Sequence, residues 1–247
     1  MREQPEQQAP PVQRLRIRYA KRGRLRFTSH RDFSRAFERA VFRARVPMAY
    51  SSGFNPHPRI SYAGAAPTGS ASEAEYLEIA LAEVVDPADV HASLAASLPD
   101  GLDILEVVAS AGGSMPDRLT ASVWRLSLDR TAVEAAQDAV RTLLDTPEVL
   151  VERMTKKGLR RFDARAAIHS AAVRGEDPGR PGCAILDVVL RHGSPSVRPD
   201  DVLAALHATS GLDVTAALQQ RLAQGPLDEA DGTVGDPLAP DRDAADR

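Results

Sequence analysis

The sequence predicts an α+β fold: a ferredoxin-like mixed or antiparallel sheet with helices on one face, built twice in two such halves. Strand-like alternation and helix-like apolar spacing follow each other along the chain, and this order starts again after a Gly- and Ser-rich stretch at residues 110–116. With 247 residues, 43% hydrophobic and 26% charged, the chain is long enough to bury two cores.

The first half begins with two short alternating segments. Residues 14–20 alternate basic and apolar side chains, and residues 24–28 repeat this pattern after a tight turn. We therefore expect a hairpin with one buried face and one wet, positively charged face. Ser29 is then expected to cap a helix from about His30 to Arg45, in which apolar residues recur every three or four positions.

The rest of the first half continues as strand, strand, helix and strand. Asp86 and Pro87 are typical of the N-cap and first position of a helix, which should end near Leu98. The strands are expected at residues 59–63, 76–81 and 102–109.

The second half repeats the alternation with different residues. Strands are expected at residues 122–128, 149–154 and 184–190, and helices at residues 131–144 and 198–208. The ends of the chain are polar, and the last 24 residues hold seven acidic side chains against two basic ones. The predicted organisation is a disordered N-terminus at 1–12, a basic α+β domain at 13–110, a linker at 111–121, a second α+β half at 122–223, and a disordered acidic tail at 224–247.

Composition excludes several classes of protein. Cys183 is the single cysteine, so neither an intrachain disulfide nor a multi-cysteine metal site can form. No apolar run reaches the roughly 18 residues of a membrane span, and the first residues lack a signal-peptide pattern. We expect a cytoplasmic protein that does not bind a membrane, with no cofactor and no metal on this chain.

Positive charge is concentrated near the N-terminus. Between Arg14 and Tyr62, thirteen Lys and Arg residues face only Asp32 and Glu38, although the whole chain has a formal net charge of −3. Like charges on neighbouring strands are destabilising unless an anion bridges them, so the pattern favours an anionic partner, with RNA as the expected polyanion. The alternative is an ordinary solvated strand face. The candidate anion-binding residues are Arg16, Arg18, Arg22, Arg24, Arg26, Ser29 and Arg31.

Two neighbouring features are candidate sites. His30 and Asp32 at the helix start could serve acid–base chemistry, as could His57. Residues 50–58 combine turn formers in a loop that should hold one shape and present its side chains to a ligand. The alternative is a structural connector with Phe54 in the core, where Tyr19 and Phe27 are also expected. The loop candidates are Tyr50, Gly53, Phe54, Asn55, Pro56 and His57.

Two further segments have plain structural interpretations. Residues 64–73 are small and flexible but lack the spacing of a phosphate-binding glycine loop. Residues 153–174 form a second basic patch, which is typical of a solvated hairpin. Between its terminal arginines it carries Lys156, Lys157, Arg160, Arg161 and Arg165.

Several of these motifs resemble one family. The run at residues 23–32, the stretch at 39–47, the loop at 50–58 and the Glu75–Glu78 segment together are similar to the radical-SAM-linked proteins. That family is a domain of unknown function found fused to radical-SAM proteins or encoded beside them, and the resemblance covers about residues 13–210. The matching family-typical positions are Ser29, His30, Asp32, Tyr50, Gly53, Phe54, Asn55, Pro56 and Pro58.

The resemblance implies an accessory role beside a radical-SAM protein, in the modification of RNA. Our main hypothesis is an RNA-binding or substrate-presenting accessory protein that acts with a radical-SAM enzyme. No catalytic motif is visible in the sequence, which leaves open whether the chain is itself an enzyme. One alternative is a stand-alone RNA-processing or RNA-modifying enzyme that uses His30 or His57 as acid or base. Another is a protein–protein adaptor whose basic face docks on an acidic surface, including the acidic tail of another copy.

Overall fold

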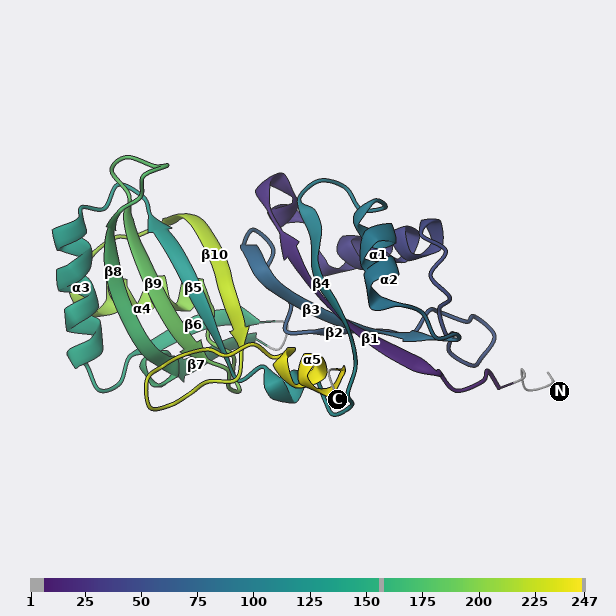
Figure 1. Ribbon diagram of the computed structural model, residues 1–247. Coiled ribbons are helices and arrows are strands. Elements are labelled where there is room, and N and C mark those ends of the chain that lie inside the picture. The colour runs from purple at the N-terminus through teal and green to yellow at the C-terminus, as the bar shows by residue number, and fades with distance from the viewer. Residues whose placement is uncertain (1–6, 156–157, 246–247) are drawn as a thin grey trace. The chain divides into compact units, whose positions relative to one another are not determined.

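The computed structural model describes residues 7–155 and 158–245, which form two compact units (Figure 1). The first unit contains Met1–Asp117 together with Pro237–Arg247, and the second contains Arg118–Asp236. The boundary after Asp117 lies inside the linker expected from the sequence. Both units combine antiparallel strands with helices, so the α+β class predicted from the sequence is confirmed.

The first unit has the strand order of a ferredoxin-like sheet. Its strands lie in the order β4-β1-β3, with β2 paired to the outer side of β3, and every pairing is antiparallel. Helices connect β1 to β2 and β3 to β4, as the split β-α-β arrangement requires. The elements are β1 (Gln13–Lys21), α1 (His30–Arg43), β2 (Ile60–Ala63), β3 (Ala71–Leu81), α2 (Pro87–Ala95) and β4 (Leu102–Ala109).

Helices α1 and α2 cover the same face of this sheet. Phe33 and Phe37 of α1 and Leu94 of α2 belong to one buried cluster with Leu15 and Ile17 of β1. Burying such a side chain is worth about 1.5–3 kcal/mol, so this cluster fixes the position of α1 on the sheet. The opposite side of α1 is consequently free to carry polar residues.

The predicted hairpin is wrong in its second arm. Residues Gly23–Phe27 form a short 3₁₀ helix, η1, and the neighbours of β1 are β3 and β4. Gly23 has a positive φ of 53°, and Leu25 N donates to Arg22 O at 3.1 Å, which closes a tight turn instead of extending a strand. Phe27 is consequently 60% exposed, whereas Tyr19 is buried as expected.

The second face of β1 is covered, not wet. The C-terminal helix α5 (Ala239–Ala245) contacts β4 (Figure 1). Its Asp241 is buried together with Arg16. The predicted disordered tail at 224–247 is therefore wrong for its described residues, because a buried ion pair anchors it. Of the residues 1–12 that were predicted to be disordered, residues 1–6 lie outside the described residues. At the other end of this segment, Val12 N donates to Leu81 O of β3 at 2.9 Å.

The second unit repeats the plan of the first. Its strands lie in the order β10-β5-β9-β8, all antiparallel, and a separate hairpin of β6 and β7 follows its first helix. The two predicted halves thus share one topology. The elements are β5 (Ala121–Leu128), α3 (Val133–Asp145), β6 (Leu150–Thr155), β7 (Gly158–Asp163), β8 (Ile168–Glu176), β9 (Ala184–Arg191), α4 (Pro199–Ser210) and β10 (Ala216–Gly225).

Strands β8 and β10 were not predicted from the sequence. Neither strand has a clean alternation of buried and exposed residues. The register of β8 against β9 shifts between Ile168 and Ser170 and again between Val173 and Gly175. The register of β10 against β5 also shifts twice. Each bulge breaks the period-two pattern on which strand prediction depends. Across the described residues, no helix combines the length and apolar character that crossing a membrane requires.

Candidate nucleic-acid interface

Arg16 does not face solvent. Its guanidinium is fully buried and donates to both carboxylate oxygens of Asp241, at 2.9 and 3.0 Å, and to Glu78 Oε2 at 3.1 Å. It also donates to the carbonyl oxygens of Gly112 and Gly113, at 2.9 and 2.6 Å. A buried charge must be paired and hydrogen-bonded, and Arg16 is both. The prediction that Arg16 binds an external anion is therefore wrong.

Arg18 and Arg22 also have partners within the first unit. The half-buried Arg18 donates to the carbonyl oxygen of Glu73 at 2.9 Å. Arg22 is exposed and forms ion pairs with Glu73 and with Asp103, the latter at 2.7 Å. The hydrogen bond to Glu73 raises the pKa of Arg22 further above its already high ordinary value. Arg22 is thus paired with carboxylates of the same chain, whereas Arg18 is held by a backbone carbonyl.

Arg24 and Arg26 lie on the 3₁₀ turn that replaced the predicted strand. Arg24 is exposed. Arg26 donates weakly to Gly23 O at 3.4 Å, and its guanidinium lies 4.5 Å from the centroid of the exposed Phe27 ring. These two arginines remain available for an anionic ligand, but they project from η1 and not from a sheet.

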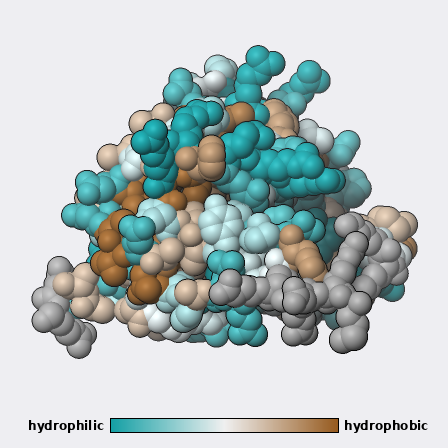
Figure 2. All heavy atoms as spheres, turned by 90° about the vertical axis from the view of Figure 1, so that its right-hand side faces the viewer, coloured by the Kyte–Doolittle hydropathy of each residue, from teal (hydrophilic) through white to brown (hydrophobic). Residues whose placement is uncertain are grey.

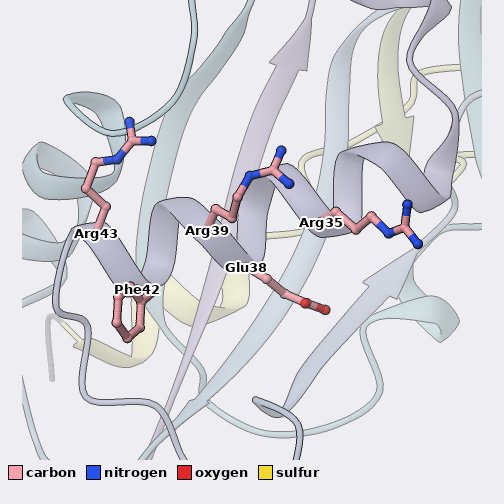
Figure 3. Close-up of a pocket in the computed structure, with 5 residues that line it drawn as sticks. All are labelled: Arg35, Glu38, Arg39, Phe42 and Arg43. Atoms are coloured by element: carbon pink, nitrogen blue, oxygen red, sulfur yellow. The ribbon is translucent and has the colours of Figure 1, made fainter.

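The exposed side of α1 carries a row of four arginines. Arg31, Arg35, Arg39 and Arg43 recur at every fourth position and are all exposed. Figure 3 shows Arg35, Arg39 and Arg43 along one side of the helix, with Glu38 and Phe42 pointing to the other side. Figure 2 shows hydrophilic side chains covering the upper part of the surface that faces right in Figure 1. We call Arg31, Arg35, Arg39 and Arg43 the α1 arginine row.

The α1 arginine row is not neutralised within the described residues. No ion pair in residues 7–155 or 158–245 involves a member of the row, and Arg43 donates only to the neutral carbonyl of Ser97, at 3.2 Å. Like charges at i,i+4 cost about 0.2–0.5 kcal/mol per pair, so the three consecutive pairs cost on the order of 1 kcal/mol. An anion bound along the row would remove this repulsion.

The helix start has a structural role. Ser29 is the N-cap of α1, as predicted: its Oγ accepts from Asp32 N at 3.2 Å and donates to Asp32 Oδ2 at 2.7 Å. His30 makes an edge-to-face contact with Tyr62, with ring centroids 4.8 Å apart. Burial raises the pKa of Tyr62. Asp32 is thus committed to the cap, and His30 is held against an aromatic ring.

The loop at 50–58 has the fixed shape expected from its turn formers. Ser51 N donates to His57 O at 2.9 Å and His57 N donates to Ser51 Oγ at 3.0 Å, which closes the loop at its base. Gly53 has a φ of 127°, which only glycine adopts readily. Phe54 is 67% exposed, so the alternative that placed it in the core is wrong. Asn55, Pro56 and His57 are exposed beside it.

The second basic patch contains both exposed and internally bonded arginines among its described residues. Arg160 and Arg161 lie on the exposed strand β7 of the β6–β7 hairpin, as the solvated-hairpin interpretation expects, and Lys156 and Lys157 lie outside the described residues. Arg165 instead donates to the carbonyl oxygen of Leu144 at 3.3 and 3.2 Å, near the end of α3. The residues described here contain no group of three or more His, Cys, Asp or Glu arranged to hold a metal ion.

The prediction from the sequence put the anion-binding surface of the first unit mainly on a hairpin and did not single out the arginines of α1 beyond Arg31. It named Arg31 and missed Arg35, Arg39 and Arg43, because the arginines of α1 looked like ordinary solvated positions of an amphipathic helix. Their four-residue spacing was a visible signal. Only the structure shows that Arg14, Arg16 and Arg22 form ion pairs within the first unit. Among the described residues, the arginines of the α1 arginine row form none.

Comparisons with known proteins identify a family but no activity. A family model described as an uncharacterized protein conserved in bacteria (DUF2344) matches residues 14–199. No curated protein matches the chain. Among solved structures, a chain of a Cbf5-Nop10-Gar1 complex is similar with a TM-score of 0.46 and 9% identity, over 90% of this chain and 55% of that chain. This chain therefore spans about half the length of that one.

Proposed function

This chain belongs to DUF2344, an uncharacterized family of proteins conserved in bacteria. We propose its function on the basis of the α1 arginine row. The protein is an accessory RNA-binding protein that holds RNA phosphates on the exposed side of α1. The observation that carries this proposal is four exposed arginines at four-residue spacing, none of them in an ion pair within the described residues. Exposed aromatic side chains near them fit a nucleic acid better than an acidic protein surface, because bases stack on aromatic rings.

The partner and the compartment are part of the same proposal. The sequence resemblance to radical-SAM-linked proteins suggests that the RNA is presented to a radical-SAM enzyme for modification, in the cytoplasm. The support for this partner is the resemblance of the motifs at residues 23–32 and 50–58. The protein itself contributes RNA binding, and the chemistry belongs to the partner.

Two double variants with the same change in net charge test the role of the α1 arginine row. R35Q/R39Q removes two unpaired arginines, whereas R14Q/R22Q removes two exposed arginines that already have ion pairs with Glu78, Glu73 and Asp103. Binding of a fluorescently labelled RNA is measured by anisotropy between 50 and 300 mM salt. Since each neutralised phosphate of a single strand contributes about 0.7 to the slope of log K against log salt, R35Q/R39Q should flatten the slope by about 1.4.

The control variant should leave this slope nearly unchanged, because its arginines are occupied by carboxylates of the same chain. Equal slopes for the two double variants would show that net charge alone drives binding and would remove α1 from the interface. Failure of the wild-type protein to bind RNA at 50 mM salt would overturn the proposed function as a whole.

A further inference from the structure

A groove lies beside the α1 arginine row, between α1 and the segment that follows it. Its volume is about 400 Å³, within the range of roughly 300–1,000 Å³ that is typical of small-ligand pockets. Its walls combine one acidic, one basic and several apolar or aromatic side chains: Glu38, Val41, Phe42, Arg45, Val46, Tyr50 and Pro58.

Two exposed aromatic rings border this groove. Phe42 projects from α1 with 84% of its surface exposed, and Tyr50 borders the groove with 41% exposed. Phe42 comes directly before Arg43 and points to the other side of the helix from the arginine row (Figure 3). An apolar ring with this exposure is unfavourable in water, and a planar partner stacked on it would bury the ring.

Glu38 is an acid among arginines that it does not pair with. It lines the groove together with Phe42 and lies one turn from Arg35, yet it forms no ion pair or hydrogen bond within residues 7–155 and 158–245. Figure 3 shows its carboxylate on the Phe42 side of α1, away from the guanidinium groups of Arg39 and Arg43. Its oxygens are therefore available to accept hydrogen bonds from a ligand in the groove.

We infer that this groove binds one unpaired base of single-stranded RNA, with guanine preferred. The inference rests on the proposed function, since the α1 arginine row holds the phosphates on one side of the helix. The base stacks on Phe42 and presents its Watson–Crick edge to Glu38. A duplex cannot bind in this way, because pairing keeps that edge of the base occupied.

Guanine is preferred because of the donors on its edge. Its N1–H and N2 amino group are adjacent donors, so a carboxylate can accept two parallel hydrogen bonds, as it does from arginine. Inosine keeps N1–H but lacks the amino group. Uracil has a single N3–H flanked by two carbonyl oxygens, which a carboxylate repels. The expected order of affinity is guanine, then inosine, then uracil.

The test compares three labelled RNA oligonucleotides of twelve nucleotides. All positions are uridine except one central position, which differs among the three. With guanosine, inosine or uridine at that position, the wild-type protein should bind the guanosine oligonucleotide about tenfold more tightly than the uridine one, which is the size expected for a good two-bond contact. Inosine should lie between them. Annealing the guanosine oligonucleotide to its complement should abolish the preference.

Three variants separate base recognition from charge. E38Q removes the carboxylate from the groove, and E83Q makes the same change in net charge at an exposed glutamate of the first unit outside it. Both variants should strengthen binding of the uridine oligonucleotide slightly, because each removes one negative charge. Only E38Q should reduce the ratio of the affinity for the guanosine oligonucleotide to that for the uridine oligonucleotide to about one. F42A should lower affinity for all three oligonucleotides and reduce the ratio too, because the exposed ring supplies stacking and not folding.

The outcomes are distinct. Equal affinity of the wild-type protein for the three oligonucleotides would overturn the base site, and so would an affinity ratio that is unchanged in E38Q. In either case the phosphate contacts of the α1 arginine row would still be tested separately by R35Q/R39Q. A guanosine preference that persists in the duplex would also overturn it. Absence of any RNA binding would overturn this inference and the proposed function together.

Discussion

Replacing Asp241 by asparagine should destabilise the first unit more than any other single change to its C-terminal helix. Both oxygens of Asp241 accept from Arg16, and Oδ1 also accepts from Ala111 N at 2.9 Å. Asparagine has nearly the same shape, but it removes the negative charge and places an amide N–H group against the guanidinium. Arg16 would remain fully buried, with Glu78 as its remaining acidic partner among the described residues.

The size of the effect follows from this burial. Breaking a buried ion pair by removing one partner costs about 3–5 kcal/mol. Because Glu78 and two backbone carbonyls still bind Arg16, we expect the lower end, about 3 kcal/mol. For a unit of this size, such a loss lowers the midpoint of thermal unfolding by roughly 10 °C.

The measurement is thermal and urea unfolding of the full chain, followed by circular dichroism. The matched control is D243N, an exposed acid in the same helix, which should change stability by less than about 0.5 kcal/mol. The double variant R16M/D241N should lose less than the two single variants together, because it removes both charges and leaves neither one buried without its partner. Equal midpoints for D241N and D243N would refute the argument that this ion pair anchors α5.

Two further predictions concern single positions. Burial lowers the pKa of His192, which contacts Leu119 O at 2.8 Å and Ser122 Oγ at 3.0 Å. The unfolded state therefore binds more protons than the folded state, so the stability of the protein should fall as pH drops below about 6.5. The urea midpoint of H192Q should depend less on pH than that of the wild-type protein, and a parallel decline in both proteins would contradict this. At Gly101, φ is 92° and a Cβ would lie 3.1 Å from Arg22 O, so G101A should lose about 2 kcal/mol of unfolding free energy. The control G179A, at an exposed glycine without a positive φ, should be nearly neutral in the same unfolding assay. Similar losses in both variants would show that backbone strain is not the cause.

Local signals in the sequence were sufficient for many elements. Ser29 and Asp86 cap α1 and α2 through side-chain bonds to the backbone, as their types and positions predicted. The strand at Leu102–Ala109 has the predicted limits. These features depend on residues within a few positions of each other, so neighbouring residues alone carry the information.

The candidate site was predictable only in part. The excess of positive charge in the first unit and the fixed loop at 50–58 were visible in the sequence, and so was the spacing of Arg31 and Arg35. The strand arginines were misjudged, because alternation of basic and apolar residues looks the same whether the basic face meets water or another part of the chain.

The sequence by itself thus determined the class of fold, its two halves and the helix that carries the arginines. Only the tertiary structure decided which arginines are internally paired: Arg16 meets Asp241 across 225 positions of sequence, and Arg22 meets Asp103 across 81. The physical reason is that the partner of a charge depends on distance in space, which local patterns do not encode. For the same reason, only the structure shows that Arg31, Arg35, Arg39 and Arg43 of α1 have no ion-pair partner among the described residues.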